Sequence, residues 1–556
     1  MGRQRAIAEE DIKSKLIRKI DDLSSKKSAK YVVYASSLIF FFAFILIPPI
    51  AGILENLNKL GAIYYDPSLL ANANLAIVNS FIIAFTVAAL DLIAALPLAW
   101  FIVRSKMRLM NFIDALVNVP FLLPTTALGY SFLLFWSSRD GIPRIFGAES
   151  LVSPGFALVL LLHFAFSYPV IVRVMVGELL TYREVYEVAA RTLGAQPFTA
   201  VRTITLPLLK PGIIASFLLS FARSLSETGA TVIVAGNFEN GSVFIFKNIG
   251  KVGEGALVYV SSVLILTSTI IFFLIKLLAP KLKFPIKRAS PPIERKLSSY
   301  GAVKFRDGAA ILVFLALVIA PSLFVALPIL NAFLDGTVNE MVAGSELWST
   351  FWRSMLISYA VGSTSTLINI VFGLPAAILI ARKKLGRATS IIKSLVSIPI
   401  IVPSIALGVS LKLFWGRYGF IPELWVIVLS HTTITYTYFV ESMSAAIEGI
   451  PVEIEDVAST LGAKPFMIFR RITLPLTKYA VFSGAILTFT RALGETGAAK
   501  AVVRTKDLQT LPVLLVDWIV NKYATSSQSA LGVGLYILSA FIMLLALRFI
   551  IRGRKR

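Results

Sequence analysis

The sequence contains no cysteine and only two histidines in 556 residues. Without cysteine the chain can form no disulfide bond, no thiolate metal site and no cysteine nucleophile. Two histidines leave little metal chemistry, so we expect neither a metal site nor a cofactor. Charged side chains make up 15% of the residues, whereas hydrophobic ones make up 56%. A water-soluble protein of this length does not tolerate that balance, so the composition predicts a polytopic membrane protein.

The sequence also lacks the phosphate-binding motif G-x-x-x-x-G-K-[ST]. In that motif a glycine-rich loop cradles the phosphates of ATP. The chain is therefore not expected to be an enzyme, and any ATP hydrolysis that serves it is expected in a separate polypeptide.

Long apolar runs, by contrast, are abundant. A helix needs roughly 20 mostly apolar residues to cross a hydrocarbon core about 30 Å thick. Runs of this kind predict an all-α fold with about 12 transmembrane helices. They lie near 31–53, 76–103, 111–137, 152–179, 206–236, 256–279, 307–333, 351–382, 388–415, 423–447, 473–503 and 528–552. Because about 30 residues precede the first run, we expect it to be retained as a span and not cleaved as a signal peptide.

The net charge is +23, from 54 lysines and arginines against 31 acidic residues. In a soluble protein this excess would suggest nucleic acid, but here the basic residues flank the predicted spans and indicate membrane topology. We therefore expect membrane lipid as a partner and no nucleic acid. The amino-terminal tail 1–30 and the carboxyl end are both strongly basic. The bias of basic residues toward the cytoplasm therefore predicts that both termini are cytoplasmic.

An internal repeat divides the chain into two halves. Residues 187–211 align with 455–479 at an offset of 268, with 15 of 25 positions identical, and 221–230 align with 489–498. Six spans per half is an even number, so both copies emerge on the same side and the repeat is parallel. We expect a first half at 31–279, a second half at 307–556, and between them a cytoplasmic linker at 280–306 that its prolines keep from forming helix.

Each repeated loop has the composition of a short helix that lies across the membrane exit. The helix-favouring stretch ends at a glycine, small alanines allow a partner to approach closely, and the chain returns to the membrane just after Leu-Pro. The residues concerned are Glu187, Ala189, Ala190, Gly194 and Pro207 in the first loop, and Glu455, Ala458, Gly462 and Pro475 in the second.

These loops resemble the EAA loops of ABC importer permeases of the MetI-like type, over about 72–276 and 349–548. The resemblance implies that the two loops dock on two copies of an ABC ATPase subunit. It also implies an extracytoplasmic solute-binding protein, a prokaryotic inner or plasma membrane, and import by ATP-driven alternating access. The usual Glu-Ala-Ala is altered in both loops, which leaves open which acid takes the family's part.

Ionisable residues recur inside the predicted fifth and eleventh spans. Arg223 and Glu227 lie four residues apart, as do Arg491 and Glu495, so each pair is predicted to share one helix face. An ionised side chain in mid-membrane costs roughly 2.5–3.5 kcal/mol and should face protein or water. One hypothesis is that the two segments meet on the pseudo-twofold axis and form the translocation path or its gate, and the other is a structural ion pair. The segments also contain Thr228, Gly229, Thr496 and Gly497.

Three further features of the spans have mainly structural interpretations. His163 and His431 occupy equivalent positions and favour hydrogen-bonded packing over substrate binding. Asp91 is expected to pair with a neighbouring helix. The prolines of the third and ninth spans predict kinks with free carbonyl groups.

The substrate stays open at this level. A fused two-half chain is similar to ferric-iron and thiamine permeases, whereas the segment from Glu227 to Asn237 resembles sulfate and molybdate permeases. A proton-coupled secondary transporter is the alternative function, because parallel repeats and intramembrane carboxylates occur there too. The paired loops argue against it.

Overall fold

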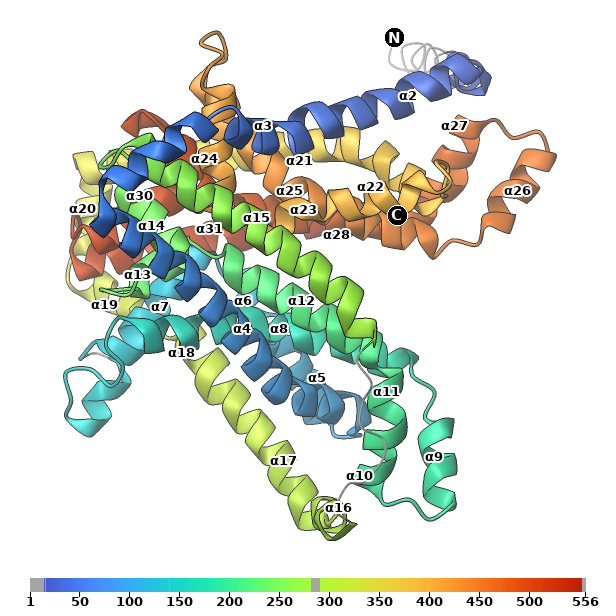
Figure 1. Cartoon of the computed structure of the whole chain (residues 1–556), viewed down its shortest axis with the longest axis horizontal. Coiled ribbons are helices and arrows are strands. Elements are labelled where there is room, and N and C mark those ends of the chain that lie inside the picture. The colour runs from blue at the N-terminus through green and yellow to red at the C-terminus, as the bar shows by residue number, and fades with distance from the viewer. Residues whose placement is uncertain (1–14, 16, 140, 282–290, 553–556) are drawn as a thin grey trace, which may run out of the picture.

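The computed structural model describes residues 15, 17–139, 141–281 and 291–552, and within them all regular structure is helical. In Figure 1 the ribbons of the two halves meet at one end of the molecule and diverge toward the end that carries the loop helices α9 (Val185–Thr192) and α26 (Val452–Thr460). The prediction of an all-α polytopic membrane protein is confirmed.

The main helices of the first half follow the predicted spans. They are α2 (Lys27–Phe40), α3 (Ile47–Leu54), α4 (Pro67–Arg104), α5 (Arg108–Leu116), α6 (Val119–Leu122), α7 (Thr125–Ser137), α8 (Phe156–Thr181), α12 (Lys210–Ser226), α13 (Gly229–Val234), α14 (Gly241–Asn248) and α15 (Glu254–Leu278).

The second half repeats this order. Its main helices are α17 (Tyr300–Val313), α18 (Ala320–Leu323), α19 (Ala326–Leu334), α21 (Glu346–Ala381), α22 (Ala388–Val396), α23 (Ile398–Ile401), α24 (Ser404–Trp415), α25 (Glu423–Glu448), α28 (Leu474–Leu493), α29 (Gly497–Val502), α30 (Leu511–Val520) and α31 (Ser526–Arg552).

Among the described residues, eight helices are long and apolar enough to cross a membrane, and three bent helix pairs raise the number to eleven. The remaining predicted span, the tenth, at 423–447, corresponds to α25, which is 26 residues long but rich in threonine. Its buried threonine hydroxyls are satisfied within the protein: Thr432 and Thr435, for example, donate to the carbonyls four residues earlier, at 2.7 Å. Hydroxyls satisfied in this way let a less apolar helix lie among the other spans.

The third and ninth spans are each broken in two, as their prolines predict. The pair α5–α6 and α7 bends by 105° and the pair α22–α23 and α24 by 103°. In both cases the residue before a proline, Leu123 or Val402, is extended. Proline disfavours helical geometry in the preceding residue, so the break occurs at the same place in both halves.

A third bend, of 71°, occurs only in the first half, between 197–208 and α12. Pro211 lies there, whereas the equivalent residue of the second half is Tyr479. Proline lacks the amide hydrogen for an intrahelical bond and its ring clashes with the carbonyl four residues earlier. The second half, with tyrosine, continues as one long helix.

The first helix of each half packs against the opposite half. Ser410 donates to the carbonyl of Pro49, and Phe40 stacks on Phe372 with ring centroids 4.2 Å apart. In the other direction, Ser131 donates to the carbonyl of Pro321 at 2.6 Å. Ser131 and Ser410 occupy equivalent positions on α7 and α24, so the exchange is symmetric.

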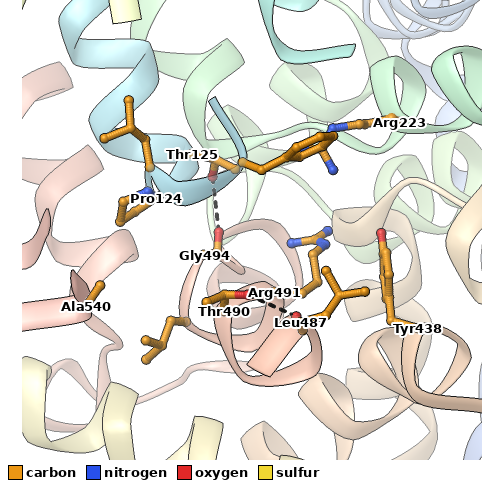
Figure 2. A pocket seen from close by; sticks show the side chains of 12 residues that line it. Pro124, Thr125, Arg223, Tyr438, Leu487, Thr490, Arg491, Gly494 and Ala540 are labelled. Carbon is orange, nitrogen blue, oxygen red and sulfur yellow. Dashed lines mark hydrogen bonds between the residues drawn. The ribbon is translucent and has the colours of Figure 1, made fainter. Parts of the chain in front are cut away.

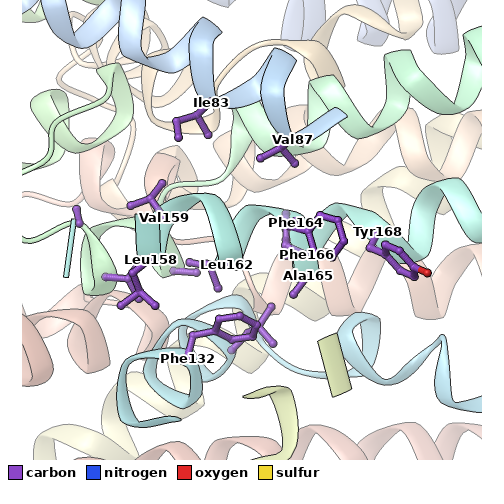
Figure 3. Packing of buried hydrophobic residues seen from close by; sticks show 14 of the residues in the cluster. Ile83, Val87, Phe132, Leu158, Val159, Leu162, Phe164, Ala165, Phe166 and Tyr168 are labelled. Atoms are coloured by element: carbon purple, nitrogen blue, oxygen red, sulfur yellow. The ribbon is translucent and has the colours of Figure 1, made fainter. Parts of the chain in front are cut away.

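The apolar interior of the first half forms where α4, α7 and α8 meet. Figure 3 shows Ile83 and Val87 of α4 facing Leu162 of α8, with Phe132 of α7 beneath them. All four side chains are essentially inaccessible to solvent. In a membrane this packing fixes the helices by close van der Waals contact, because lipid is as apolar as the core itself.

The predicted linker is partly helical, which corrects the expectation that its prolines prevent helix. Residues 291–297 form α16 (Pro291–Leu297), with Pro291 and Pro292 in its first turn, where their missing amide hydrogens cost nothing. The following helix α17 starts at Tyr300, inside the predicted linker. Residues 282–290 lie outside the described part of the chain.

Candidate functional site

The two loop helices are held by equivalent acid side chains. Glu187 accepts from Arg104 at 3.2 Å and from Thr205 at 3.3 Å. Glu455 accepts from Arg382 at 2.8 Å and from Thr473 at 3.0 Å. Each glutamate therefore joins its loop helix to the end of the long helix α4 or α21 and to the helix that returns into the membrane. Of the acids in the altered motif, these two have matching structural partners.

Gly194 and Gly462 end α9 and α26 with left-handed backbone, at φ +95° and +85°. The amide of Ala195 donates back to Ala190, and that of Ala463 to Ala458, both at about 3.1 Å or less. This is the bonding pattern by which a glycine after a helix satisfies its last carbonyl groups. Ala189 is exposed, while Ala190 and Ala458 are half-buried by these turns. Pro207 and Pro475 lie inside the returning helix, each just after a π-helical turn, Val201–Thr205 or Phe469–Thr473.

Two residues that the sequence interpretation missed are the leucines just before these glycines. Leu193 is 89% exposed and Leu461 is 83% exposed, at equivalent positions. Large apolar side chains left open on a polar loop indicate a protein contact surface. The repeat itself carried the signal, because Leu-Gly-Ala is identical in both copies.

The predicted fifth and eleventh spans end earlier than expected. The helix α12 stops at Ser226 and α28 at Leu493, and both glutamates follow these ends. The prediction that Arg223 and Glu227, or Arg491 and Glu495, share one helix face is therefore wrong, although Arg491 and Glu495 do form an ion pair, at 2.8 Å. The physical cause is a capping interaction: Glu227 accepts from the amide of Ala230, and Glu495 from that of Ala498, both at 3.0 Å. Carboxylates at the start of α13 and α29 are favoured by the positive end of the helix dipole.

The two Glu-Thr-Gly segments contact each other across the halves. A Cβ atom on Gly229 would lie 2.4 Å from the hydroxyl oxygen of Thr496, and one on Gly497 would lie 2.7 Å from that of Thr228. Distances this short leave no room for a side chain at either glycine. The two segments therefore meet, as the first hypothesis requires.

Two hydrogen bonds join the halves at the same level. Thr125, the first residue of α7, donates to the carbonyl of Gly494 at 3.1 Å. Ser404, the first residue of α24, donates to the carbonyl of Ser226 at 3.3 Å. Both donors follow the proline break of their span, and both acceptors end the helix of the opposite half. We call these four residues, with the two Thr-Gly pairs, the cross-half contact.

A pocket lies between the halves beside this contact. Its cavity volume is about 80 Å³ and it is open to solvent on one side, and Figure 2 shows Arg223 and Arg491 reaching toward it from opposite halves. Tyr438 of α25 and Thr490 of α28 also line it. Because Thr490 and Arg491 precede the end of α28, the pocket lies on the loop-helix side of the cross-half contact.

The two arginines have different surroundings. Arg491 forms an ion pair with Glu495 at 2.8 Å. Arg223 instead donates to the carbonyl of Phe166 at 3.0 Å and stacks on that ring, with its guanidinium carbon 3.8 Å from the centroid. In the described part of the chain, Arg223 makes no ion pair with a carboxylate. The pocket is therefore lined by two guanidinium groups, of which only that of Arg491 is paired with an acid.

Two further polar groups of the spans, His163 and Asp91, have structural partners. His163 is buried between Ser224 and Thr231, at 2.8 Å from each hydroxyl. Asp91 of α4 accepts from Ser167 and, at 2.8 Å, from Ser220. These contacts match the expected packing roles.

Comparison with known proteins agrees with this architecture. The chain matches the family described as "Binding-protein-dependent transport system inner membrane component" over residues 91–284 and 373–556, once in each half. It is 28% identical over 218 residues to the molybdenum transport system permease protein ModB of Mycobacterium tuberculosis, covering 35% of this chain and 82% of that protein.

Two further relatives have similar names. The sulfate transport system permease protein CysT of Salmonella typhimurium is 30% identical over 244 residues, or 43% of this chain and 88% of that protein. The molybdenum transport system permease protein ModB of Escherichia coli K12 is 34% identical over 161 residues, or 26% of this chain and 69% of that protein. With one family match in each half and apolar helices throughout, the chain belongs to the inner-membrane components of binding-protein-dependent transport systems, as a two-half ABC importer permease.

Proposed function

We propose that this permease carries a tetrahedral oxyanion of the molybdate or sulfate class through the path between its two halves. The observation that carries the proposal is the pair of arginines in the pocket beside the cross-half contact. Guanidinium groups present planar forks of donors that match the oxygens of such anions. Since Glu495 pairs directly with only one arginine, an anion can complete the charge balance of the site.

The cationic candidates fit this pocket less well. Ferric iron and thiamine both carry positive charge and would be repelled by two guanidinium groups in a site of low polarity. Proteins similar to this chain are named for molybdenum and sulfate transport, which also supports an oxyanion substrate. The proton-coupled alternative is not favoured, because family membership calls for a binding protein as partner.

The position of the pocket supports a transport cycle by alternating access. In this conformation the cross-half contact joins the halves at one end, while their ribbons diverge toward α9 and α26 (Figure 1). We infer that two ATPase subunits dock on α9 and α26, that the diverging side is cytoplasmic with both termini, and that ATP binding brings the loop helices together. Closing that side would open the cross-half contact to the solute delivered by the binding protein.

Calorimetric titration of the binding protein encoded with this permease tests the substrate class. Molybdate, tungstate and sulfate should give tight, saturable binding, whereas ferric iron and thiamine should give none. Tight binding of ferric iron or thiamine without any response to the oxyanions would contradict the proposal.

A further inference from the structure

Each repeated loop, which we call a coupling loop (187–207 and 455–475), leads into the helix that returns to the membrane, and the first turn of that helix has no cap of its own. After Gly194 the chain forms α10 (Pro197–Ala200), and after Gly462 it forms α27 (Pro465–Ile468). The residues at the cap positions, Gln196 and Lys464, make no side-chain capping bond. Serine, threonine, aspartate or asparagine normally fills such a position. Since proline has no amide hydrogen, the next residue carries the first donor that needs an acceptor.

In both loops a serine from a distant segment supplies that acceptor. The amide of Phe198 donates to the hydroxyl oxygen of Ser298 at 3.1 Å, across 100 residues of sequence. The amide of Phe466 donates to that of Ser24, also at 3.1 Å, across 442 residues. Ser298 directly follows α16 in the linker, and Ser24 lies in the helical segment 17–25 before α2. The same type of cap thus forms in both loops. The linker and the amino-terminal tail, which supply the two serines, were expected only as basic surface segments.

Ionic contacts strengthen both caps. Glu294 of α16 is buried, forms an ion pair with Arg202 at 2.8 Å, and also accepts from Thr199. On the other side, Asp22 forms an ion pair with Lys464, the residue at the vacant cap position. A buried ion pair with several hydrogen bonds fixes geometry more firmly than an exposed one. The linker side is therefore held more tightly than the tail side.

The two serines also lie at the start of the exchanged first helices. From Ser298 the chain continues through α17 and α18 to Pro321, whose carbonyl accepts from Ser131 of α7. From Ser24 it continues through α2 and α3 to Pro49, whose carbonyl accepts from Ser410 of α24. A rod of helix, Lys27–Leu54 or Tyr300–Leu334, thus begins after one extended residue, Lys26 or Ser299, and runs from each capping serine to the broken span that forms the cross-half contact.

We propose that Ser24 and Ser298 are positioning residues of the transport cycle, capping the coupling loops in trans so that loop movement is passed along the exchanged helices to the cross-half contact. This rests on the proposed docking of ATPase subunits at α9 and α26, but not on the identity of the solute. Each cap keeps its loop in a fixed position relative to the helix that follows the capping serine. Without these caps, the ATPase would move the loops without moving the exchanged helices with them.

The test compares Ser24→Ala/Ser298→Ala with the control Ser25→Ala/Ser299→Thr, which alters the neighbouring serines but keeps a hydroxyl to cap α17. Ser25 bonds only its own segment, to Asp22, and Ser299 caps α17 locally. The first readout is amide hydrogen exchange at 198–200 and 466–468 of the purified permease in nanodiscs. The second is the rise in ATPase activity of the full complex when its binding protein is loaded with the solute that calorimetry identifies.

The cap variant should exchange at least tenfold faster at both loops, keep its ATPase subunits and basal hydrolysis, and lose most of the rise on addition of loaded binding protein. The control should behave as the natural chain, and Ser24→Thr/Ser298→Thr should restore coupling because it retains the hydroxyl. Unchanged exchange, unchanged stimulation, or loss of assembly in the cap variant would overturn the proposal. If the oxyanion hypothesis fails, the exchange result still stands.

Discussion

The hydroxyl of Thr496 lies directly against the backbone of Gly229 in the opposite half, and a Cβ atom there would come within 2.4 Å of it. The equivalent approach of Thr228 to Gly497 closes the same level of the molecule. Together with the bonds from Thr125 and Ser404, these contacts make one continuous junction between the halves.

Gly229→Ala should disrupt this junction, because overpacking a tight contact costs roughly 1–3 kcal/mol. We expect a loss of ATP-driven uptake of at least tenfold in proteoliposomes, with the permease still inserted and bound to its ATPase. Gly177→Ala is the matched control, since a Cβ atom at Gly177 meets nothing within 4 Å and alanine favours helix. Full uptake in the Gly229 variant would contradict a role for this tight junction in transport.

Leu193→Ser/Leu461→Ser should weaken the binding of the ATPase subunits at least tenfold, because both leucines are exposed apolar side chains on the coupling loops. Co-purification from detergent measures this. Leu208→Ser/Leu476→Ser removes two other exposed leucines at equivalent positions and should leave ATPase binding intact. Equal loss in both double variants would argue against a docking role for the first pair.

Asp91→Asn should be tolerated in both stability and transport. Asn369 occupies the equivalent position of the second half and donates to Thr435 at 2.8 Å, so an amide already serves there. Asp91→Leu, by contrast, leaves the hydroxyls of Ser167 and Ser220 without this acceptor, at a cost of roughly 1–3 kcal/mol. Thermal unfolding in detergent compares the two variants. A strong defect in Asp91→Asn alone would indicate that the negative charge itself is used.

The two halves should assemble without a covalent connection. When residues 1–281 and 291–556 are produced as separate chains, we expect them to co-purify through a tag on either one, because the exchanged first helices interlock them. A first chain that starts at residue 57 lacks its exchanged helix and should bind much more weakly. Separation of the longer pair would mean that the linker itself holds the halves together.

The start of α4 should respond to acid. Asp66 caps this helix, and its pKa is lowered below 3.8, first because the Ser68 hydroxyl donates to the carboxylate and then because the Leu69 amide does. A carboxylate whose folded-state pKa is lowered stabilises the fold above its unfolded value, about 4, and loses this effect as the pH falls through the folded value. Hydrogen exchange at Ser68 and Leu69, corrected for intrinsic rates, should accelerate below about pH 4 and do so less in Asp66→Asn.

The spans and their breaks could be predicted from the sequence, whereas two helix ends and the exchange of first helices could not. Apolar runs identify the spans, because a helix needs a minimum apolar length to cross the membrane. Pro124 and Pro403 identify the breaks, because proline disfavours helical geometry in the residue before it. The ends of α12 and α28 could not be predicted in this way. They depend on Glu227 and Glu495 capping the next helix, which competes with continued helix only in the folded surroundings. The exchange of first helices is likewise invisible to periodicity, because it depends on partners more than 180 residues apart.

Uptake of radiolabelled molybdate into proteoliposomes, with ATP inside and loaded binding protein outside, tests the central claim most directly. The natural complex should accumulate molybdate, and excess sulfate or tungstate should compete where the binding protein accepts them. Arg223→Gln should reduce uptake at least tenfold while retaining assembly and basal ATP hydrolysis. Uptake of ferric iron or thiamine in place of molybdate, or full molybdate uptake in the Arg223 variant, would contradict an oxyanion path lined by this arginine.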